Sequence, residues 1–493
     1  MGGGPAAWAA AYPDRTAIID DRGSLTFRQF SERTYRLAKR LTSELAGTPA
    51  TVGIMCRNHA DALVAMCAAS ATGARVVLLS SDFGPRQIMQ VNSREHLDAV
   101  VYDDEFAETV ADFKGKRWSA WSSGPSAETD LDRLIASTPT GDPPRPLRPS
   151  SLVILTSGST GTPKGAPRGE SSSLLLPAGL LSRIPLRGNE TVLVAAPVFH
   201  GWGLLIAMMV LNLGSTLVLR RRFDAAQTLV DLDELGCSTF IAVPTMLRRM
   251  VSLAGEIRTA DLAKLRIVAS GGARLDLALV EGVTAQFGPV LYNLYGSTEA
   301  SFISIATPED LREAPASAGI PPLGITVRIA GQDGRHGANG AEGRILVRTP
   351  GQIPAYTDGH SSVGTDGFLD TGDRGYLDAA GRLHVSGRSD SMIVSGGENV
   401  FPEEVECALL AHPDIGDAAV TGVDDDEFGQ RLQAFVVAAK PDGIDSDTIR
   451  AYLAAELPRS RMPRDIAVVL ELPRSSAGKV LRGDLDALKS RLQ

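Results

Sequence analysis

A hydrophobic run leads into a loop of hydroxyl and glycine residues in Ser151-Leu-Val-Ile-Leu-Thr156-Ser157-Gly158-Ser159-Thr160-Gly161-Thr162-Pro163-Lys164-Gly165. The apolar part predicts a buried strand. Glycines let backbone N–H groups approach a polyanion, hydroxyls donate to phosphoryl oxygens, and Lys164 supplies a positive charge. This is not a Walker loop, because Gly165 stands where that motif has Ser or Thr. A flexible surface turn is the alternative, but the order of these residues favours a phosphate-binding loop.

The composition is that of a folded globular protein. The chain has 493 residues, of which 43% are hydrophobic and 22% charged, and this length corresponds to roughly three domains. Its formal net charge of −9 gives no global attraction to nucleic acids or anionic bilayers. Aromatic residues make up only 5% of the chain, which argues against base-stacking platforms. We therefore expect no nucleic-acid partner.

Cysteine usage and hydropathy indicate the compartment. The four cysteines, at positions 56, 67, 237 and 407, lie far apart, with no CxxC pair, so neither a disulfide scaffold nor a structural zinc site is expected. The longest apolar run, Leu204–Leu211, is far shorter than the roughly 20 residues that span a bilayer. The N-terminus lacks the regions of a signal peptide. We expect a cytoplasmic protein without a membrane span.

Short apolar runs alternate with amphipathic segments in the middle of the chain. Strands are predicted at residues 191–195, 215–219, 239–243, 265–269 and 290–294, with a helix capped by Asp224 and another at 277–287. This alternation favours α/β layers of largely parallel sheet. After residue 331, Gly-rich turns predict hairpins. Residues 389–493 contain two helical and three strand patterns, enough for an independent domain.

Further short segments follow in a fixed order: Tyr295-Gly-Ser-Thr-Glu299, Thr371-Gly-Asp373, Gly387-Arg-Ser-Asp390, Ser395-Gly-Gly-Glu-Asn-Val400 and Pro473-Arg-Ser-Ser-Ala-Gly-Lys479. Together with residues 151–165 they resemble the signatures of the adenylate-forming superfamily, within it the acyl-CoA synthetases, including fatty-acid-CoA ligases. One such segment could arise by chance, but six in order should not. The opening, Thr16–Asp20 followed by Leu25-Thr-Phe-Arg-Gln, also matches.

The resemblance implies an AMP-forming acid–thiol ligase that uses ATP, Mg²⁺ and coenzyme A. A carboxylate is a poor acyl donor because its leaving group would be oxide. Transfer to the α-phosphate of ATP makes a mixed anhydride with AMP as leaving group, which then acylates CoA. Because two anions must meet, such catalysis depends largely on positioning and charge neutralisation.

The resemblance also implies a role for each matching residue. Glu299 holds Mg²⁺ and Thr298 contacts the α-phosphate, although Glu299 alone could be a helix-start carboxylate. Asp373 and Arg388 bind the ribose, and Lys479 bridges the carboxylate and the α-phosphate. The other cofactor-binding residues lie in the phosphate loop, at strand ends and in a glycine loop: Thr156, Ser157, Gly158, Ser159, Thr160, Gly161, Lys164, Gly271, Gly272, Ala273, Asn293, Tyr295, Gly296, Ser297, Ser395, Gly396 and Gly397.

The fold class implied is α/β, with two domains. A large multi-layer N-terminal domain with mostly parallel sheets would span residues 1–388, and a small mobile α+β C-terminal domain residues 389–493. Because Lys479 and the phosphate loop fall in different domains, adenylation requires domain closure. The resemblance implies that the small domain then rotates about a hinge near Asp390 and presents Ser395–Glu398 to guide the pantetheine thiol.

The acyl pocket is expected to begin at Pro197-Val-Phe-His-Gly-Trp-Gly203, which resembles the corresponding segment of acyl-CoA ligases. His200 would line it as a gate or carboxylate neighbour. The segment has no aspartate to hold an α-amino group, so the substrate is expected to be an uncharged-backbone acid, whether fatty, aryl or polycyclic. An apolar wall is expected from Gly203, Leu204, Val243, Met246, Gly271, Gly272 and Ile303.

Two segments depart from the family pattern. Ala166-Pro-Arg168 replaces the usual Val-x-x-Thr-His, and Leu457–Arg464 lacks an aromatic-Lys pair. The arginines of the second segment could meet CoA phosphates or form a solvated basic face. The alternatives to a CoA ligase are an adenylate former that loads a carrier protein, an enzyme that runs one half-reaction, and a protein that binds these ligands without turnover.

Overall fold

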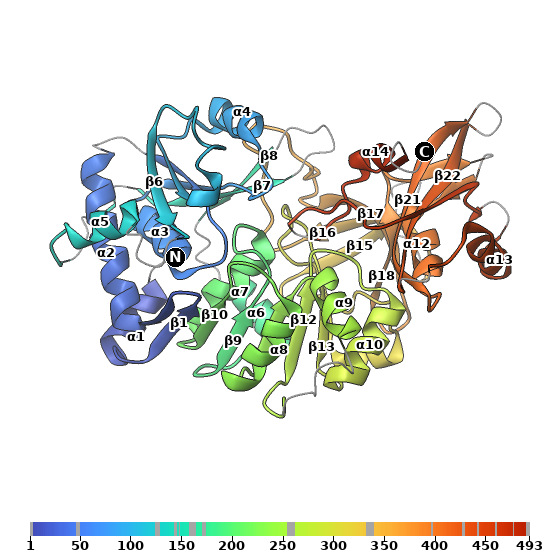
Figure 1. Ribbon diagram of the computed structural model, residues 1–493, viewed down its shortest axis with the longest axis horizontal. Coiled ribbons are helices and arrows are strands. Elements are labelled where there is room, and N and C mark those ends of the chain that lie inside the picture. The colour runs from blue at the N-terminus through green and yellow to red at the C-terminus, as the bar shows by residue number, and fades with distance from the viewer. Residues whose placement is uncertain are drawn as a thin grey trace.

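In the computed structural model, the strands of the described residues form four sheets (Figure 1). The structure describes residues 3–45, 50–123, 129–141, 145–146, 148–156, 164–169, 174–253, 262–331, 340–395, 398–425, 429–440, 443–458, 461–476 and 478–489. The two largest sheets share one hydrophobic core, and the two smaller sheets follow towards the C-terminus.

The largest sheet has the strand order β14-β13-β12-β11-β9-β10-β1-β2. Its strands are β1 (Thr16–Asp20), β2 (Gly23–Thr26), β9 (Thr191–Val194), β10 (Thr216–Leu219), β11 (Thr239–Ala242), β12 (Ile267–Gly271), β13 (Leu291–Tyr295) and β14 (Ser304–Ala306). All neighbours from β13 to β1 pair in parallel. The predicted strands and their parallel arrangement are therefore confirmed, and the carboxyl ends of β9, β11, β12 and β13 meet at one edge.

Local signals in the sequence explain the helices of this layer. Helix α8 (Ala225–Glu234) begins where the Asp224 carboxylate accepts the N–H of Gln227, as predicted. Helix α10 (Leu277–Phe287) has the predicted bounds, with the side chain of Asp276 as its cap. The other helices of the body are α1 (Gly3–Ala11), α2 (Phe27–Glu44), α3 (Ala60–Ala71), α4 (Pro85–Glu95), α5 (Asp130–Ala136), α6 (Leu175–Arg183), α7 (Gly201–Asn212), α9 (Pro244–Ser252) and α11 (Pro308–Glu313), with a 3₁₀ turn η1 (Asp104–Phe106).

The second sheet has six strands in the order β6-β5-β3-β4-β7-β8. They are β3 (Thr51–Met55), β4 (Arg75–Leu78), β5 (Ala99–Asp103), β6 (Lys116–Trp121), β7 (Ser151–Thr156) and β8 (Lys164–Gly169). The predicted strand before the phosphate loop is β7, and the chain returns antiparallel to it as β8. Strands β7 and β8 thus flank the phosphate loop at the sheet edge, and side chains two and four residues after Lys164 share its face.

The main core lies between these two sheets. It contains β3, β4, β9 and β10 together with α3 and α7. Eleven of the twelve residues of α3 are buried, which fits a helix that is apolar on all sides and enclosed by neighbours. The core therefore holds both sheets in one body, so that the edge formed by β9 and β11–β13 is fixed relative to β7 and β8.

The remaining chain forms two smaller sheets. Strands β15 (Thr326–Ala330), β16 (Gly343–Arg348), β17 (Leu369–Leu377) and β18 (Leu383–Arg388) pair antiparallel, as the Gly-rich turns predict. The last sheet comprises β19 (Ile393–Ser395), β20 (Glu398–Val400), β21 (Ile415–Asp425), β22 (Gly429–Ala438) and β23 (Asp465–Val469). Its helices are α12 (Pro402–Leu410), α13 (Ser446–Glu456) and α14 (Asp486–Lys489), with a 3₁₀ turn η3 (Arg482–Asp484). It has a hydrophobic core of its own, to which α12 and α13 contribute.

Candidate active site

Part of the predicted site lies outside the described residues. This applies to Ser157, Gly158, Ser159, Thr160 and Gly161 of the phosphate loop, to Gly396 and Gly397, and to the side chains of Thr156 and Ser395. The two ends of the phosphate loop are fixed by β7 and β8, whose register pairs Thr156 with Lys164.

A tyrosine links the predicted metal ligand, Glu299, to Lys164 at the end of the phosphate loop. The Tyr356 hydroxyl donates to Oε1 of Glu299 at 2.5 Å, and the Lys164 Nζ lies 5.6 Å from the centre of the same ring. Burial and the hydrogen bond to Glu299 raise the pKa of Tyr356 well above its usual value, so the hydroxyl keeps its proton. Tyr356 thus connects a carboxylate and a cation that are 135 positions apart in the sequence.

The chain turns tightly around Thr298 and Glu299. The Ser301 N–H donates to the Ser297 carbonyl at 2.9 Å, and Ser301 has φ +76°, a left-handed conformation that is uncommon outside glycine. A Cβ on Gly296 would lie 2.1 Å from the Ser301 carbonyl oxygen. Glycine is therefore required at position 296 for the turn that presents Glu299.

The residues predicted to bind ribose are brought together at β13, β17 and β18. The Tyr295 hydroxyl donates to Oδ2 of Asp373 at 2.5 Å, and Arg388 Nη1 lies 3.7 Å from Oδ1. Burial raises the pKa of Asp373, opposed by Tyr295 and Arg388. Arg388 also forms a two-pronged ion pair with Asp390, both contacts 2.8 Å long. The predicted acceptor and donor are therefore neighbours, and a tyrosine orients the acceptor.

The remaining predicted nucleotide contacts lie at the ends of neighbouring strands. Gly271 ends β12 and Asn293 lies on β13, where it pairs with Ser270 in register. Gly272 and Ala273 follow β12, and the backbone of Gly272 is left-handed, with φ +89°. These positions and the Glu299 turn thus share the carboxyl edge of the large sheet.

His200 immediately precedes α7, and its imidazole is packed against the ring of Phe199 at 4.6 Å between centroids. Among the described residues its buried Nε2 has no hydrogen-bond partner. Burial lowers the pKa of His200 to about 4, with a further lowering from Lys479 and an opposing effect of Asp82. The imidazole is therefore neutral at physiological pH.

The loop that carries Lys479 is docked on the body. The Ser476 N–H donates to Oδ2 of Asp82 at 2.8 Å, and a Cβ on Gly478 would lie 2.5 Å from Oγ1 of Thr245. Within the loop, Arg474 donates to the Gly478 carbonyl at 2.6 Å and pairs with Asp417. This arrangement holds exposed Lys479 near enough to His200 to affect its pKa.

Some residues of the predicted apolar wall lie next to one another beside Gly271 and Gly272, and the others are packed in the protein interior. Val243 is a close neighbour of Gly272, at 3.8 Å from a Cβ placed there, and the Trp202 ring is 3.5 Å from a Cβ on Gly271. In contrast, a Cβ on Gly203 would lie 2.3 Å from the Pro197 carbonyl oxygen. Gly203 therefore serves the close packing of α7. Leu204 and Ile303 are buried in two different core clusters, and Met246 packs partly buried against the main one.

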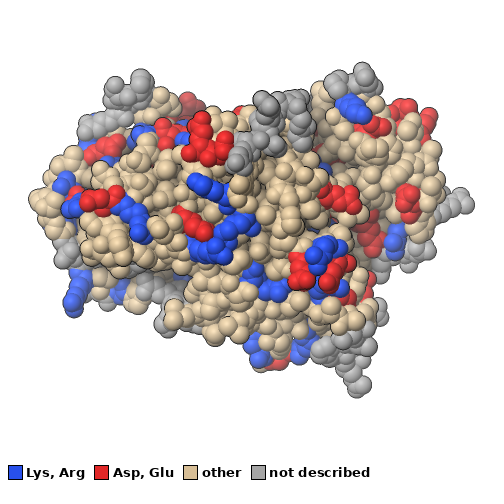
Figure 2. All heavy atoms as spheres, turned by 90° about the horizontal axis from the view of Figure 1, so that it is seen from below, with Lys and Arg blue, Asp and Glu red and all other residues tan. Residues whose placement is uncertain are grey.

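The basic residues that follow α13 are partly neutralised. Arg461 pairs with Glu404 at 3.0 Å and Arg464 with Asp425 at 3.8 Å. Arg459 lies outside the described residues. Mixed charge is a wider feature of the surface: on the face shown in Figure 2, acidic and basic side chains lie next to one another.

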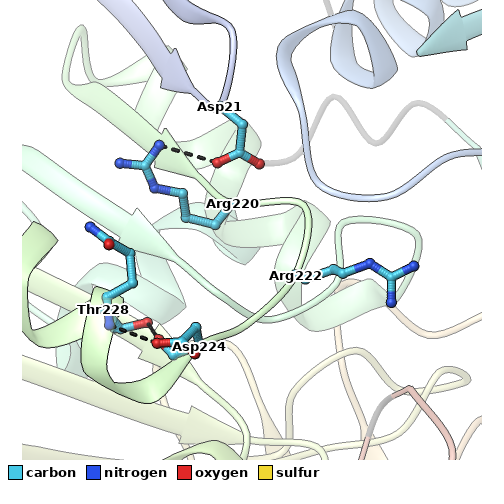
Figure 3. A pocket seen from close by; sticks show the side chains of 6 residues that line it. Asp21, Arg220, Arg222, Asp224 and Thr228 are labelled. Carbon is cyan, nitrogen blue, oxygen red and sulfur yellow. Dashed lines mark hydrogen bonds and ion pairs between the residues drawn. The ribbon is translucent and has the colours of Figure 1, made fainter. Parts of the chain in front are cut away.

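A separate hollow of about 300 Å³ lies at the end of β10 (Figure 3). It is lined by Asp21, Arg220, Arg222, Asp224, Gln227 and Thr228. Its charges are used internally, because Arg220 pairs with Asp21 and Asp231, and Asp224 caps α8. Arg222 extends away and pairs with Glu105. None of the predicted site residues lines this hollow.

The sequence did not predict a role in the candidate site for three residues. Tyr356 and Asp82 belong to no motif used above, and Arg168 was noted only as a departure from a pattern. Each acts through a contact with a residue that is distant in sequence, respectively Glu299, Ser476 and Thr298. The one signal available was Arg168 itself, a second charged residue after Lys164 on a strand that otherwise consists of Gly, Ala and Pro.

Comparison with known proteins agrees with this geometry. Residues 6–357 match the family described as AMP-binding enzyme, and residues 404–479 match the AMP-binding enzyme C-terminal domain. The chain belongs to the family of AMP-binding enzymes. The predicted recognition and the two-part α/β fold are thereby confirmed.

Individual relatives extend over nearly the whole chain. A feruloyl-CoA synthase of Amycolatopsis sp is 30% identical, covering 98% of both chains. An indoleacetate–CoA ligase of Aromatoleum aromaticum is also 30% identical, covering 98% of this chain and 97% of its own. The structure of o-succinylbenzoate CoA synthetase from Bacillus subtilis with its acyl-adenylate has 26% identity and a TM-score of 0.85, covering 98% and 97%.

This AMP-binding enzyme is an AMP-forming acyl-CoA ligase, as the sequence predicted. It activates a carboxylic acid with ATP as an acyl-adenylate and transfers the acyl group to CoA, with Mg²⁺ as the metal. The residues present fit that metal, because the Glu299 turn offers a hard carboxylate oxygen and Lys164 lies nearby to share phosphate charge. In the described part of the chain, no helix combines the length and apolarity needed to cross a bilayer.

Proposed function

We propose that this ligase activates an aromatic carboxylic acid at the site built by β8, β12, β13 and the docked Lys479 loop. The observation that carries the activation step of this proposal is the docking of the Lys479 loop on the body. The loop reaches the body through Ser476 and Gly478 and brings Lys479 close to buried His200. A cation is thereby held where a carboxylate and a phosphate would have to meet.

The residues of the site divide the work of adenylation among them. Glu299 would hold Mg²⁺, which supplies neutralisation of phosphate charge, and Thr298 would contact the α-phosphate. Lys479 would neutralise the carboxylate and α-phosphate as they approach. Neutral His200 would line the acid pocket without adding charge. We assign nucleotide binding to Asp373, Arg388, Thr156–Gly161, Lys164, Gly271–Ala273, Asn293 and Tyr295–Ser297, and pantetheine guidance to Ser395–Gly397.

An aromatic acid suits the apolar surface beside this site. Gly271 is closely enclosed by Leu294 and the Trp202 ring, whereas Gly272 is exposed and has Val243 as its neighbour. Trp202 and Val243 thus place apolar side chains beside the two glycines, and an aromatic ring can stack or pack edge-on against such a surface. The relatives named for ferulate and indoleacetate support the same class of acid.

We also propose the division of the chain at residue 388, with residues 389–493 rotating about Asp390 between the half-reactions. The separate core of the last sheet supports this division, as does the Arg388–Asp390 ion pair at its boundary. The cytoplasm is the proposed location, because ATP and CoA are available there and all four cysteines are free thiols.

The test is to incubate the protein with ATP, Mg²⁺ and CoA and each of a set of acids, and to measure thioesters by mass spectrometry. Ferulate, indoleacetate and 2-succinylbenzoate would be compared with linear acids of equal carbon number. We expect kcat/KM to favour the aryl acids by at least about tenfold. A preference for linear acids contradicts the proposed substrate class. AMP-linked acids that never become thioesters would instead indicate a different acceptor.

A further inference from the structure

Arg168 contacts the turn that contains Glu299. It stands on β8 four residues after Lys164. Its Nη1 donates to the Gly351 carbonyl at 2.8 Å, and its Nη2 donates to the Thr298 carbonyl. Burial lowers the pKa of the Arg168 guanidinium, and Glu299 is the charge that opposes this effect.

The turn that contains Glu299 is stabilised by contacts with residues distant in the sequence. The backbone of Ser301 is left-handed, a conformation that a residue other than glycine keeps only where contacts with the surrounding structure hold it. The Thr349 hydroxyl donates to the Ala300 carbonyl at 2.6 Å, and the Ile353 N–H donates to the Glu299 carbonyl at 2.9 Å. These two contacts and Arg168 bind successive carbonyls of the turn, at 298, 299 and 300. The segment that includes Thr349, Gly351 and Ile353 is therefore joined to the Glu299 turn from two directions.

We propose that Arg168 is a positioning residue for the metal site. Its planar guanidinium joins the Thr298 carbonyl to the Gly351 carbonyl and so fixes the direction in which Glu299 leaves the turn. This inference rests on the proposed role of Glu299 as the Mg²⁺ ligand. Arginine is suited to the task because its donors form a rigid fork, whereas a lysine offers a single point charge.

Arg168→Lys and Arg168→Gln test the proposal, with Arg183→Gln as the matched control. Arg183 also donates to a backbone carbonyl, that of Ile305 at 3.3 Å, and pairs with a carboxylate, that of Asp310. It is 22% exposed in its side chain and takes no part in the proposed site. Two quantities would be measured: the Mg²⁺ concentration at half-maximal ATP–pyrophosphate exchange, and the rise in Tm that Mg²⁺ produces in the presence of ATP.

Both Arg168 variants are expected to need about 10- to 100-fold more Mg²⁺, the usual cost of losing a residue that orients a metal ligand. Their Tm rise with Mg²⁺ should shrink, while KM for the acid stays unchanged. Arg183→Gln should lower Tm without moving the Mg²⁺ midpoint. A wild-type Mg²⁺ midpoint in folded Arg168→Gln would overturn the proposal. A wild-type Mg²⁺ midpoint in Arg168→Lys would show that only the positive charge is needed, and not the two-donor geometry of arginine.

Two further variants keep the result decisive. If neither Arg168 variant folds, Thr349→Val releases the same turn from its other side without a change of charge, and an unshifted Mg²⁺ midpoint there would overturn the proposal. Glu299→Gln separates this inference from the function on which it rests. If Glu299→Gln leaves the Mg²⁺ midpoint of the wild type unchanged, the proposed metal site itself is wrong.

Discussion

Asp82 provides a hydrogen bond between the body and the Lys479 loop that mutation can remove. Its exposed carboxylate accepts the Ser476 N–H at 2.8 Å. Asp82→Ala deletes this bond, whereas Asp82→Asn keeps an oxygen acceptor and removes only the charge. The two variants therefore separate the hydrogen bond from electrostatics.

The size of the effect follows from the type of bond. A hydrogen bond to a charged acceptor contributes about 1.5–3 kcal/mol, and an exposed one belongs at the lower end. A loss of about 1.4 kcal/mol lowers the ratio of docked to undocked loop about tenfold. The charge of Asp82 does not act through protonation of His200 at neutral pH, because His200 has a pKa of about 4 and removal of Asp82 would lower it further. The charge acts by strengthening the hydrogen bond, since a neutral amide oxygen is a weaker acceptor than a carboxylate.

The two half-reactions are the assay. Acid-dependent ATP–pyrophosphate exchange reports adenylation, and thioester formation from a synthetic acyl-adenylate reports the second step. We expect Asp82→Ala to slow only the first, by up to about tenfold, with Asp82→Asn between it and the wild type. Asp14→Ala, which removes an exposed carboxylate paired with Arg28, is the control. Equal slowing of both steps in a folded Asp82→Ala variant, or no slowing of the first, would refute the role of this contact.

Three other predictions address the remaining charged groups. Lys479→Ala should abolish adenylate formation and spare thioester formation from a supplied adenylate; equal loss of both half-reactions in folded protein would contradict this division. Burial raises the pKa of Asp373, so the ionised carboxylate destabilises the native state at neutral pH. Asp373→Asn should therefore raise the urea midpoint at pH 7 while weakening ATP binding in calorimetry, and the gain should vanish as pH falls through the raised pKa. The pKa of His200 is lowered from 6.5 to about 4, so the unfolded chain takes up a proton first on acidification. Wild-type stability should fall relative to His200→Gln between those pH values and stay level above them, as urea titrations would show.

Local patterns predicted the elements well where one physical signal was dominant. Helix α10 was predicted at its observed bounds, and the Asp224 cap set the start of α8. Both depend on residues within one or two turns of the chain. The parallel strands of the large sheet were predictable for a similar reason, because buried β-branched runs alternate with helices.

The hairpin at the phosphate loop could not be predicted in the same way. Strand β8 includes Gly165 and Pro167, which both lower strand propensity. It forms because β7 offers a partner over six register positions, and the place of β8 at the sheet edge tolerates a proline. The contacts of Tyr356 with Glu299 and of Arg168 with Thr298 join positions 57 and 130 residues apart. No periodicity in a single sequence encodes such pairs.

The proposed function gives a physical reason for where the cations lie. Arg168 contacts the Thr298 and Gly351 carbonyls, and Arg388 contacts Asp373, all within the proposed body, so we expect both to shape the site in both half-reactions. Lys479 is different because it is exposed on a loop held by the Asp82 contact and by packing at Thr245. Adenylation needs a cation between the carboxylate and the phosphate, but the pantetheine thiol must later approach the same carbonyl. A cation on a fixed strand would stay in that path, whereas one on a weakly docked loop can leave. A contact at the Lys479 loop that is too strong would therefore slow the second half-reaction, and the exposed Asp82 hydrogen bond is of the modest strength that such an exchange requires.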